Sequence, residues 1–150
     1  MNPKTQLAGF IAKFTPEVAA LAKAALAKLR ARFPNAIQMV YDNYNFLVIG
    51  FGPTERASEA IFSIALFARG VSLCFLRAGA KLPDPEKLLR GSGKQARHIR
   101  LESADVLDRP AVKALMMQAI KHAPVPFDSK APGRLIIKSV SAKQRPRRPT

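Results

Sequence analysis

The chain has 150 residues, of which 48% are hydrophobic, so it can bury one core and is expected to form one domain. Its formal net charge is +15, and residues 130–150 hold seven basic residues and no acidic one. The single cysteine, Cys74, excludes an internal disulfide and a thiol pair for redox or metal chemistry.

No stretch of the chain has the composition of a membrane span or a secretory signal. A membrane span needs about 18 consecutive apolar residues, and no apolar run here reaches that length. The N-terminus also lacks the apolar region and small-residue cleavage site of a signal peptide. We therefore expect a cytoplasmic protein with no membrane contact.

Residues 1–33 are predicted to form two helices that pack on the rest of the domain. Residues 5–14 place apolar side chains at helical spacing on one face, namely Leu7, Phe10, Ile11 and Phe14. Thr15 is expected to cap a second helix that has Pro16 in its first position and ends near Arg32. The basic residues of this helix lie mostly opposite its apolar stripe, which favours a solvated face over a binding face for an acidic partner.

Residues 34–122 are predicted to form the main α+β domain, which begins with two hairpins. Residues 36–42 and 45–52 have the pattern of paired strands, with Asn43-Tyr44 at the tip. Gly50 and Gly52 within the second strand indicate a bulge or a close backbone approach.

The second hairpin is formed by two apolar runs, residues 60–68 and 71–78. Their near-continuous hydrophobicity indicates central strands with both faces covered, or with one face covered and one lining a pocket. Hairpins followed by helix favour an antiparallel sheet of about five strands, flanked by N-terminal and C-terminal helices, in an α+β fold.

The rest of the chain is predicted to add a helix, a loop and a tail. A short helical piece is expected after Pro85, and Asp108 is expected to cap a helix that ends at His122. Residues 123–140 are interpreted as a loop with a possible last strand. Residues 141–150 are basic and have almost no apolar content, so we expect a disordered tail.

The loop Gly91-Ser92-Gly93-Lys94 resembles a phosphate-binding loop but matches neither nucleotide motif. A P-loop would need glycine and Ser or Thr where this chain has Leu88 and Gln95. A dinucleotide fingerprint would follow a strand and open a helix, and here that order is reversed. The glycines are therefore expected mainly to permit a turn, with anion contact through the backbone amides of Gly91, Ser92 and Gly93 as the alternative.

The strand after this loop is the stronger sign of anion binding. Lys94, Arg97 and Arg100 can converge on a phosphate or carboxylate. The alternative is structural, with Arg100 paired to Glu102, Asp84 or Glu86. A second group of polar and aromatic residues is predicted to line a pocket mouth: Tyr41, Asn43, Tyr44 and His98. Asn43 equally suits a hairpin turn.

The sequence offers little support for catalysis. His98 and His122 are the only histidines, and neither they nor the acidic residues have the spacing of a metal site. We therefore predict no catalytic residue, no metal ligand and no cofactor, and a protein that is not an enzyme. An enzyme that uses Cys74 or His98 is the competing hypothesis.

Several sequence blocks carry a family resemblance, which extends over residues 34–120. They are LPDP at residues 82–85, LLRGSGK at 88–94, RHIRL at 97–101 and the helix at 108–120. With these blocks the chain resembles the YdhG-like group of bacterial domains of unknown function, which has frataxin-like and YjbR-like neighbours. The resemblance implies a small α+β domain with an antiparallel sheet and terminal helices.

Three functions follow as hypotheses. The leading one is a cytoplasmic binding module for an anionic small molecule or an acidic protein. The first alternative is weak, sequence-independent association of the basic tail with nucleic acid. The resemblance also implies frataxin-like iron handling as a further alternative, although iron chaperones need several exposed carboxylates and the second helix carries only Glu17.

Overall fold

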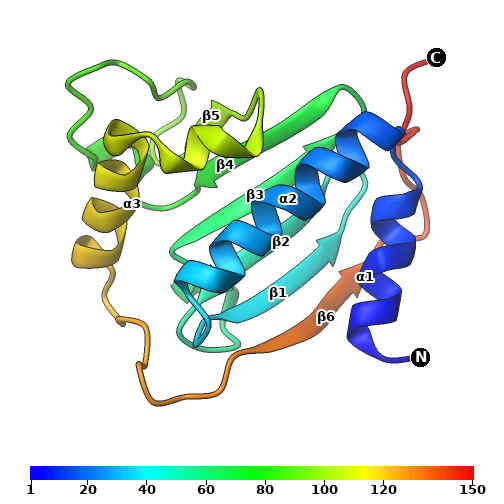
Figure 1. Ribbon diagram of the computed structural model, residues 1–150, viewed down its shortest axis with the longest axis horizontal. Coiled ribbons are helices and arrows are strands. Elements are labelled where there is room, and N and C mark those ends of the chain that lie inside the picture. The colour runs from blue at the N-terminus through cyan, green and yellow to red at the C-terminus, as the bar shows by residue number, and fades with distance from the viewer.

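Two N-terminal helices lie across one face of a six-stranded sheet in the computed structural model, which describes all 150 residues (Figure 1). Helix α1 spans Pro3–Ala12 and helix α2 spans Pro16–Arg32. The predicted cap of α2 is confirmed, since the Thr15 hydroxyl accepts a hydrogen bond from the Val18 amide at 3.2 Å. None of the helices combines the length and apolar character needed to cross a bilayer.

The sheet confirms the predicted α+β class and adds one strand to it. Its spatial order is β5-β4-β3-β2-β1-β6, and the first five strands form an antiparallel meander. β6 pairs with β1 in parallel, with a register shift between Val40 and Tyr41. The strands are β1 Ile37–Asp42, β2 Leu47–Gly52, β3 Phe62–Phe67, β4 Gly70–Phe75, β5 Arg97–Arg100 and β6 Arg134–Val140. The last strand is therefore real, but it is parallel because the chain returns past α3 (Pro110–His122) before it pairs.

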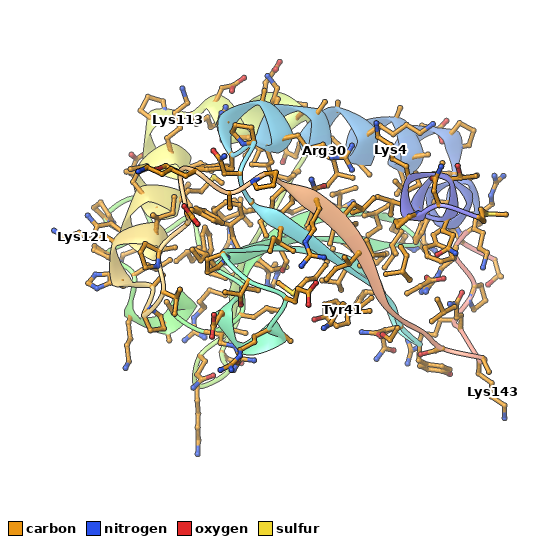
Figure 2. The ribbon with its side chains drawn as sticks, turned by 90° about the horizontal axis from the view of Figure 1, so that it is seen from below. Lys4, Arg30, Tyr41, Lys113, Lys121 and Lys143 are labelled. Carbon is orange, nitrogen blue, oxygen red and sulfur yellow. The ribbon has the colours of Figure 1, made fainter.

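Alternate strand residues point toward the helices and build the core. The largest fully buried side chains on this face include Phe51, Phe62, Phe75, Ile49, Leu66 and Leu73. The opposite face of the sheet carries no α-helix, and its central positions are small: Gly50, Ser63, Ala65, Ser72 and Cys74. Figure 2 shows Tyr41 on this face, away from α2. Of the two arrangements predicted for the central strands, the structure has the one in which α-helices cover one face and the other face lines a pocket.

Three local predictions are wrong. The first hairpin turns through four residues, 43–46, and the Asn43 amide donates to the Phe46 carbonyl at 2.9 Å. No helix follows Pro85, because the Asp84 carboxylate accepts from the amides of Leu88 and Leu89 at 2.9 Å each and holds a turn.

The third wrong prediction concerns Asp108, which does not cap the last helix. α3 begins at Pro110 without a side-chain cap. The Asp108 carboxylate instead accepts from Lys28 at 2.6 Å and from Arg32, which ties the short 3-10 helix Ala104–Asp108 to α2. These two cations lower the pKa of Asp108, chiefly through the Lys28 hydrogen bond. Long-range ion pairing has replaced the local cap.

The C-terminal tail also differs from the expectation of disorder. The amides of Ser141 and Arg145 donate to the carbonyls of Asp42 and Tyr44, both at 2.8 Å. The Arg147 side chain is buried beside Asp42, at 2.9 Å. The tail therefore lies along the first hairpin, where it covers the end of the sheet near α1 (Figure 1).

Candidate functional site

The glycine loop is a surface turn at the free edge of the sheet. Arg90 and His98 exchange two backbone hydrogen bonds, of 2.8 and 3.0 Å, which close the loop between them. Gly91 has a φ of +115°, a conformation that glycine adopts without strain. Ser92, Gly93 and Lys94 are exposed. The loop has the turn geometry that one of its two interpretations predicts, and anion contact by its amides stays a prediction.

The structure does not bring Arg97 and Arg100 together. Successive strand residues point to opposite faces, so Arg97 shares the face of buried Ile99 while Arg100 lies on the helix-free face. Arg97 donates to the carbonyl oxygens of Gly93 and Ala96, at 2.6 and 2.7 Å.

The Arg100 side chain interacts with different partners from those that the sequence suggested. It donates to the Arg69 carbonyl at 2.8 Å and lies over the Phe67 ring at 5.5 Å, rather than pairing with an acidic residue. Arg97 and Arg100 are thus held separately by backbone oxygens, and they do not form one anion pocket with Lys94.

Two of the four predicted pocket residues line a cavity on the helix-free face. Tyr41 and Asn43 border a space of about 190 Å³ together with Val48, Gly50, Ser63, Leu76 and Arg77. Tyr44 lies outside it at the hairpin tip and is 51% exposed. His98 lies outside it as well, exposed on the same face but on the edge strand β5.

The polar groups of this small cavity are only partly satisfied. The Ser63 hydroxyl is buried and has no hydrogen-bond partner. Burial raises the pKa of the Tyr41 phenol, and the positive charge of Arg77 opposes that rise. The phenol is thus a neutral hydrogen-bonding group at neutral pH. At about 190 Å³ the space is smaller than the roughly 300 Å³ of ordinary ligand pockets.

Cys74 and His98 are direct cross-strand neighbours on the helix-free face, which is the arrangement an enzyme hypothesis would require. Burial, however, raises the pKa of the Cys74 thiol to about 11. A nucleophilic cysteine needs a lowered pKa, because the thiolate is the reactive form. The environment of Cys74 therefore opposes nucleophilic catalysis.

We expect Cys74 to react slowly with iodoacetamide in the folded protein. With a pKa of about 11, the thiolate fraction at pH 8 is about 100-fold below that of an ordinary cysteine. Mass spectrometry of alkylated protein should show a rate lower by about that factor than in urea-unfolded protein. A folded-state rate equal to the unfolded one would restore the catalytic hypothesis.

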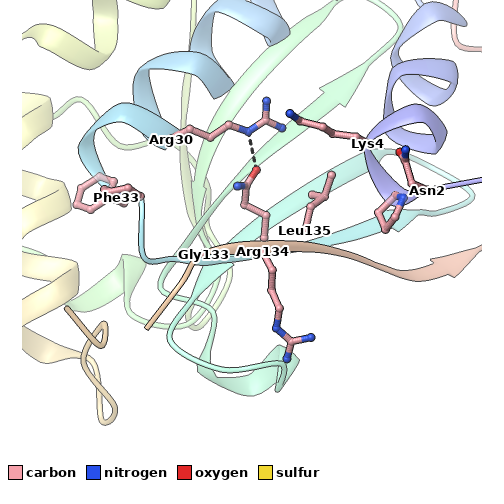
Figure 3. Close-up of a pocket in the computed structure, with 10 residues that line it drawn as sticks. Asn2, Lys4, Arg30, Phe33, Gly133, Arg134 and Leu135 are labelled. Carbon is pink, nitrogen blue, oxygen red and sulfur yellow. Dashed lines mark hydrogen bonds between the residues drawn. The ribbon is translucent and has the colours of Figure 1, made fainter. Parts of the chain in front are cut away.

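A larger cavity, of about 480 Å³, lies on the helix side between α1, the end of α2, β1 and β6. Its lining residues include Lys4, Arg30, Phe33, Gln38, Gly133 and Leu135. Figure 3 shows the ends of the Lys4 and Arg30 side chains directed at one another across this space. We call it the Lys4–Arg30 cavity.

Arg30 is held in place without an acidic partner. Its Nε donates to Gln38 Oε1 at 2.8 Å, which leaves both terminal nitrogens of the guanidinium unengaged. Burial lowers the pKa of Arg30. Arg134 also borders the space, but its side chain turns away (Figure 3) and pairs with Glu55. No carboxylate lines the cavity, so its charge is positive.

Sequence reasoning missed this cavity because its two cations are far apart in the chain. Arg30 belongs to the basic face of α2, which the pattern indicated to be solvated. Lys4 is brought near only because α1 packs beside β6 at the parallel edge of the sheet. A parallel final strand leaves no local sequence signal that would have pointed to this pairing.

Metal-binding side chains do not gather anywhere in the molecule. No group of three or more His, Cys, Asp or Glu residues is placed to hold a metal ion. Comparisons with known proteins add no assignment, since no protein-family model, curated protein or solved structure matches the chain.

Proposed function

We propose that the protein is a binding module for a small anionic molecule, which it holds in the Lys4–Arg30 cavity. The observation that carries the proposal is that two cationic side chains face one another in a cavity that no carboxylate lines. Two like charges that share one space repel each other, and they do so more strongly where water is partly excluded. An anion between them replaces this repulsion with two attractions.

The residues around the two cations indicate the chemistry of the ligand. The Gln38 hydrogen bond fixes the Arg30 guanidinium, whose two free terminal nitrogens can bind a carboxylate or phosphate through paired hydrogen bonds. Phe33 and Leu135 form an apolar part of the wall of the same cavity. Its volume of about 480 Å³ lies within the range of roughly 300–1,000 Å³ typical of small-molecule sites. A phosphorylated or carboxylated metabolite with a short apolar part fits this description.

The cavity is a better anion site than the glycine loop for a geometric reason. Lys4 and Arg30 point into one space, whereas Arg97 and Arg100 point to opposite faces of β5. Anion binding by Lys94, Arg97 and Arg100 stays a prediction, as does membership of the YdhG-like group.

Thermal unfolding with inorganic phosphate tests the proposal. At about ten times its Kd, phosphate should stabilise the wild-type protein by about 1.4 kcal/mol, which raises Tm by about 4 °C beyond sodium chloride of equal ionic strength. Arg30→Gln and Lys4→Gln should lose this gain, because each removes one attraction. Lys121→Gln is the matched control, since Lys121 lies on α3 and away from the cavity (Figure 2).

Two results would count against the cavity. A phosphate gain that survives in both Arg30→Gln and Lys4→Gln would remove it as the site. A phosphate gain that is lost only in the triple variant Lys94→Gln/Arg97→Gln/Arg100→Gln would return the site to the glycine loop.

Without phosphate, Arg30→Gln should change the free energy of unfolding by less than about 0.5 kcal/mol, because the lost Gln38 bond is offset by relief of charge repulsion.

A further inference from the structure

The tips of two hairpins and the C-terminal tail meet at one end of the sheet, remote from α3. The Arg145 amide donates to the Tyr44 carbonyl at 2.8 Å, which holds the tail on the first tip. The rings of Phe46, from the first tip, and Phe67, from the second, meet edge to face at 6.5 Å. A hollow of about 410 Å³ lies between these segments.

Aromatic rings stand in solvent at this end. Tyr44 is 51% exposed and Phe46 is 45% exposed, although rings of this size are usually buried. Guanidinium groups lie on the rings: Arg145 is 5.7 Å from the centre of Tyr44, and Arg100 is 5.5 Å from the centre of Phe67. The tail supplies Arg145 and β5 supplies Arg100, while the hairpins supply the rings.

The charge of this end is positive and is not neutralised. Arg69, Arg145 and Arg148 line the hollow, and no Asp or Glu side chain does. None of these arginines, nor Arg100, forms a salt bridge. The nearest acidic residue of the hairpin, Asp42, is buried and already paired with Arg147. A polyanion approaching this surface meets no opposing carboxylate side chain.

We propose that this arginine–aromatic end, formed by Tyr44, Phe46, Phe67, Arg69, Arg100 and Arg145, binds single-stranded nucleic acid. Exposed rings stack on unpaired bases, and arginines beside them contact the intervening phosphates. A duplex keeps its bases stacked internally and cannot use the rings. An acidic peptide would use the arginines but leave the rings without partners, so nucleic acid matches both features.

Fluorescence anisotropy with labelled oligo(U) and oligo(dT) decamers tests the proposal on the full chain. The double variant Tyr44→Ala/Phe46→Ala should weaken binding by at least about tenfold, because stacking on both rings is lost. Arg69→Gln/Arg145→Gln should weaken binding and lower the slope of log K against log salt by about 1.4, or roughly 0.7 per phosphate contact. Lys113→Gln/Lys121→Gln makes the same charge change on α3, at the opposite end of the molecule from the tail (Figure 2), and should have little effect.

Three further ligands make the outcome decisive. A duplex of the same length should bind more weakly than the single strand. The affinities for heparin and poly-glutamate should not change when the two rings are removed. The proposal is overturned if the duplex binds as well as the single strand, or if Tyr44→Ala/Phe46→Ala binds the decamers like wild type. It is also overturned if poly-glutamate binds more tightly than the decamers at equal charge. Circular dichroism checks that each variant is folded, and Arg30→Gln should leave oligonucleotide binding unchanged, which separates this site from the Lys4–Arg30 cavity.

Discussion

Replacing Arg147 with alanine is expected to lower the free energy of unfolding by about 3 kcal/mol. The Arg147 side chain is 5% exposed and donates from Nη2 to Asp42 Oδ1 at 2.9 Å and to the Asn43 carbonyl at 2.6 Å. Its guanidinium also lies over the Phe14 ring, 5.6 Å from the centre. Removing one member of a buried ion pair costs about 3–5 kcal/mol, because the other charge loses its partner. Urea denaturation measures the difference.

The free energy lost in Arg147→Ala is limited, because the tail that carries residue 147 can leave the surface. When the ion pair is broken, residues 141–150 can detach and return the remaining charge to water. Arg147→Ala, Asp42→Ala and deletion of residues 141–150 should therefore cost similar amounts, and Arg147→Ala should add almost nothing to Asp42→Ala. In both single variants trypsin should cut the freed tail after Lys143 at least about tenfold faster than in wild type.

Arg148→Ala is the matched control, since Arg148 neighbours Arg147 but is exposed and donates only to the Lys13 carbonyl, at 3.1 Å. It should change stability by less than about 0.5 kcal/mol. A loss in Arg147→Ala no larger than the loss in Arg148→Ala would show that the tail does not dock through this pair.

The same ion pair is incompletely satisfied, which predicts a rescue. Asp42 Oδ2 and the Nε and Nη1 of Arg147 are buried without hydrogen-bond partners. Such groups lose water without compensation, so the pair gains less than its short distance suggests. The double variant Asp42→Leu/Arg147→Met should therefore recover most of the stability that either single alanine variant loses.

The sequence predicted those parts of the fold that depend on local pattern. Helical spacing of apolar residues and the Thr15 cap located α1 and α2, because caps and amphipathic stripes act within one or two turns. Alternation of apolar residues located the first hairpin, and two near-continuous apolar runs located the second. These signals are carried by neighbouring residues, so they can be recognised without a structure.

What the sequence could not predict depends on contacts across the chain. Asp108 stands where a cap would be expected, yet it binds Lys28 and Arg32, which lie more than 70 residues earlier. Arg147 lies in a segment with the composition of a disordered tail, yet its ion pair with the buried Asp42 holds that segment on the domain. Composition measures the average cost of ordering a segment, and one long-range ion pair can offset that cost.

The candidate sites follow the same division. Arg97 and Arg100 are close in sequence, but strand alternation separates them, and the pattern itself contained that information. Lys4 and Arg30 come together only through the packing of α1 beside β6. Tyr44 was predicted to line a pocket and instead meets the tail's Arg145 in solvent. Binding surfaces built from distant segments need the tertiary structure before their residues can be grouped.

Gly79→Ala is expected to destabilise the protein by about 3 kcal/mol, because a methyl group there has no space. Gly79 lies beneath the start of β5, where an added Cβ would be 2.6 Å from the Arg97 amide nitrogen and 2.9 Å from the Gln95 carbonyl oxygen. Both are backbone atoms, which cannot rotate aside as a side chain can, so the strand must shift. Overpacking of this kind costs about 1–3 kcal/mol and more where the neighbours are rigid.

The position of the clash determines what the variant should lose besides stability. The adjacent Ala80 amide donates to the same Gln95 carbonyl at 2.9 Å, and β5 is the edge strand on β4. Hydrogen exchange in Gly79→Ala should therefore accelerate in β5 before it accelerates in β1 or β2.

Gly93→Ala provides the control in the same segment, since no atom lies within 4 Å of its added Cβ. It should be neutral or stabilising by up to about 1 kcal/mol through the unfolded chain. Equal stability of the two variants would mean that the edge strand is not packed against Gly79, and β5 would then be held by its ladder with β4 alone.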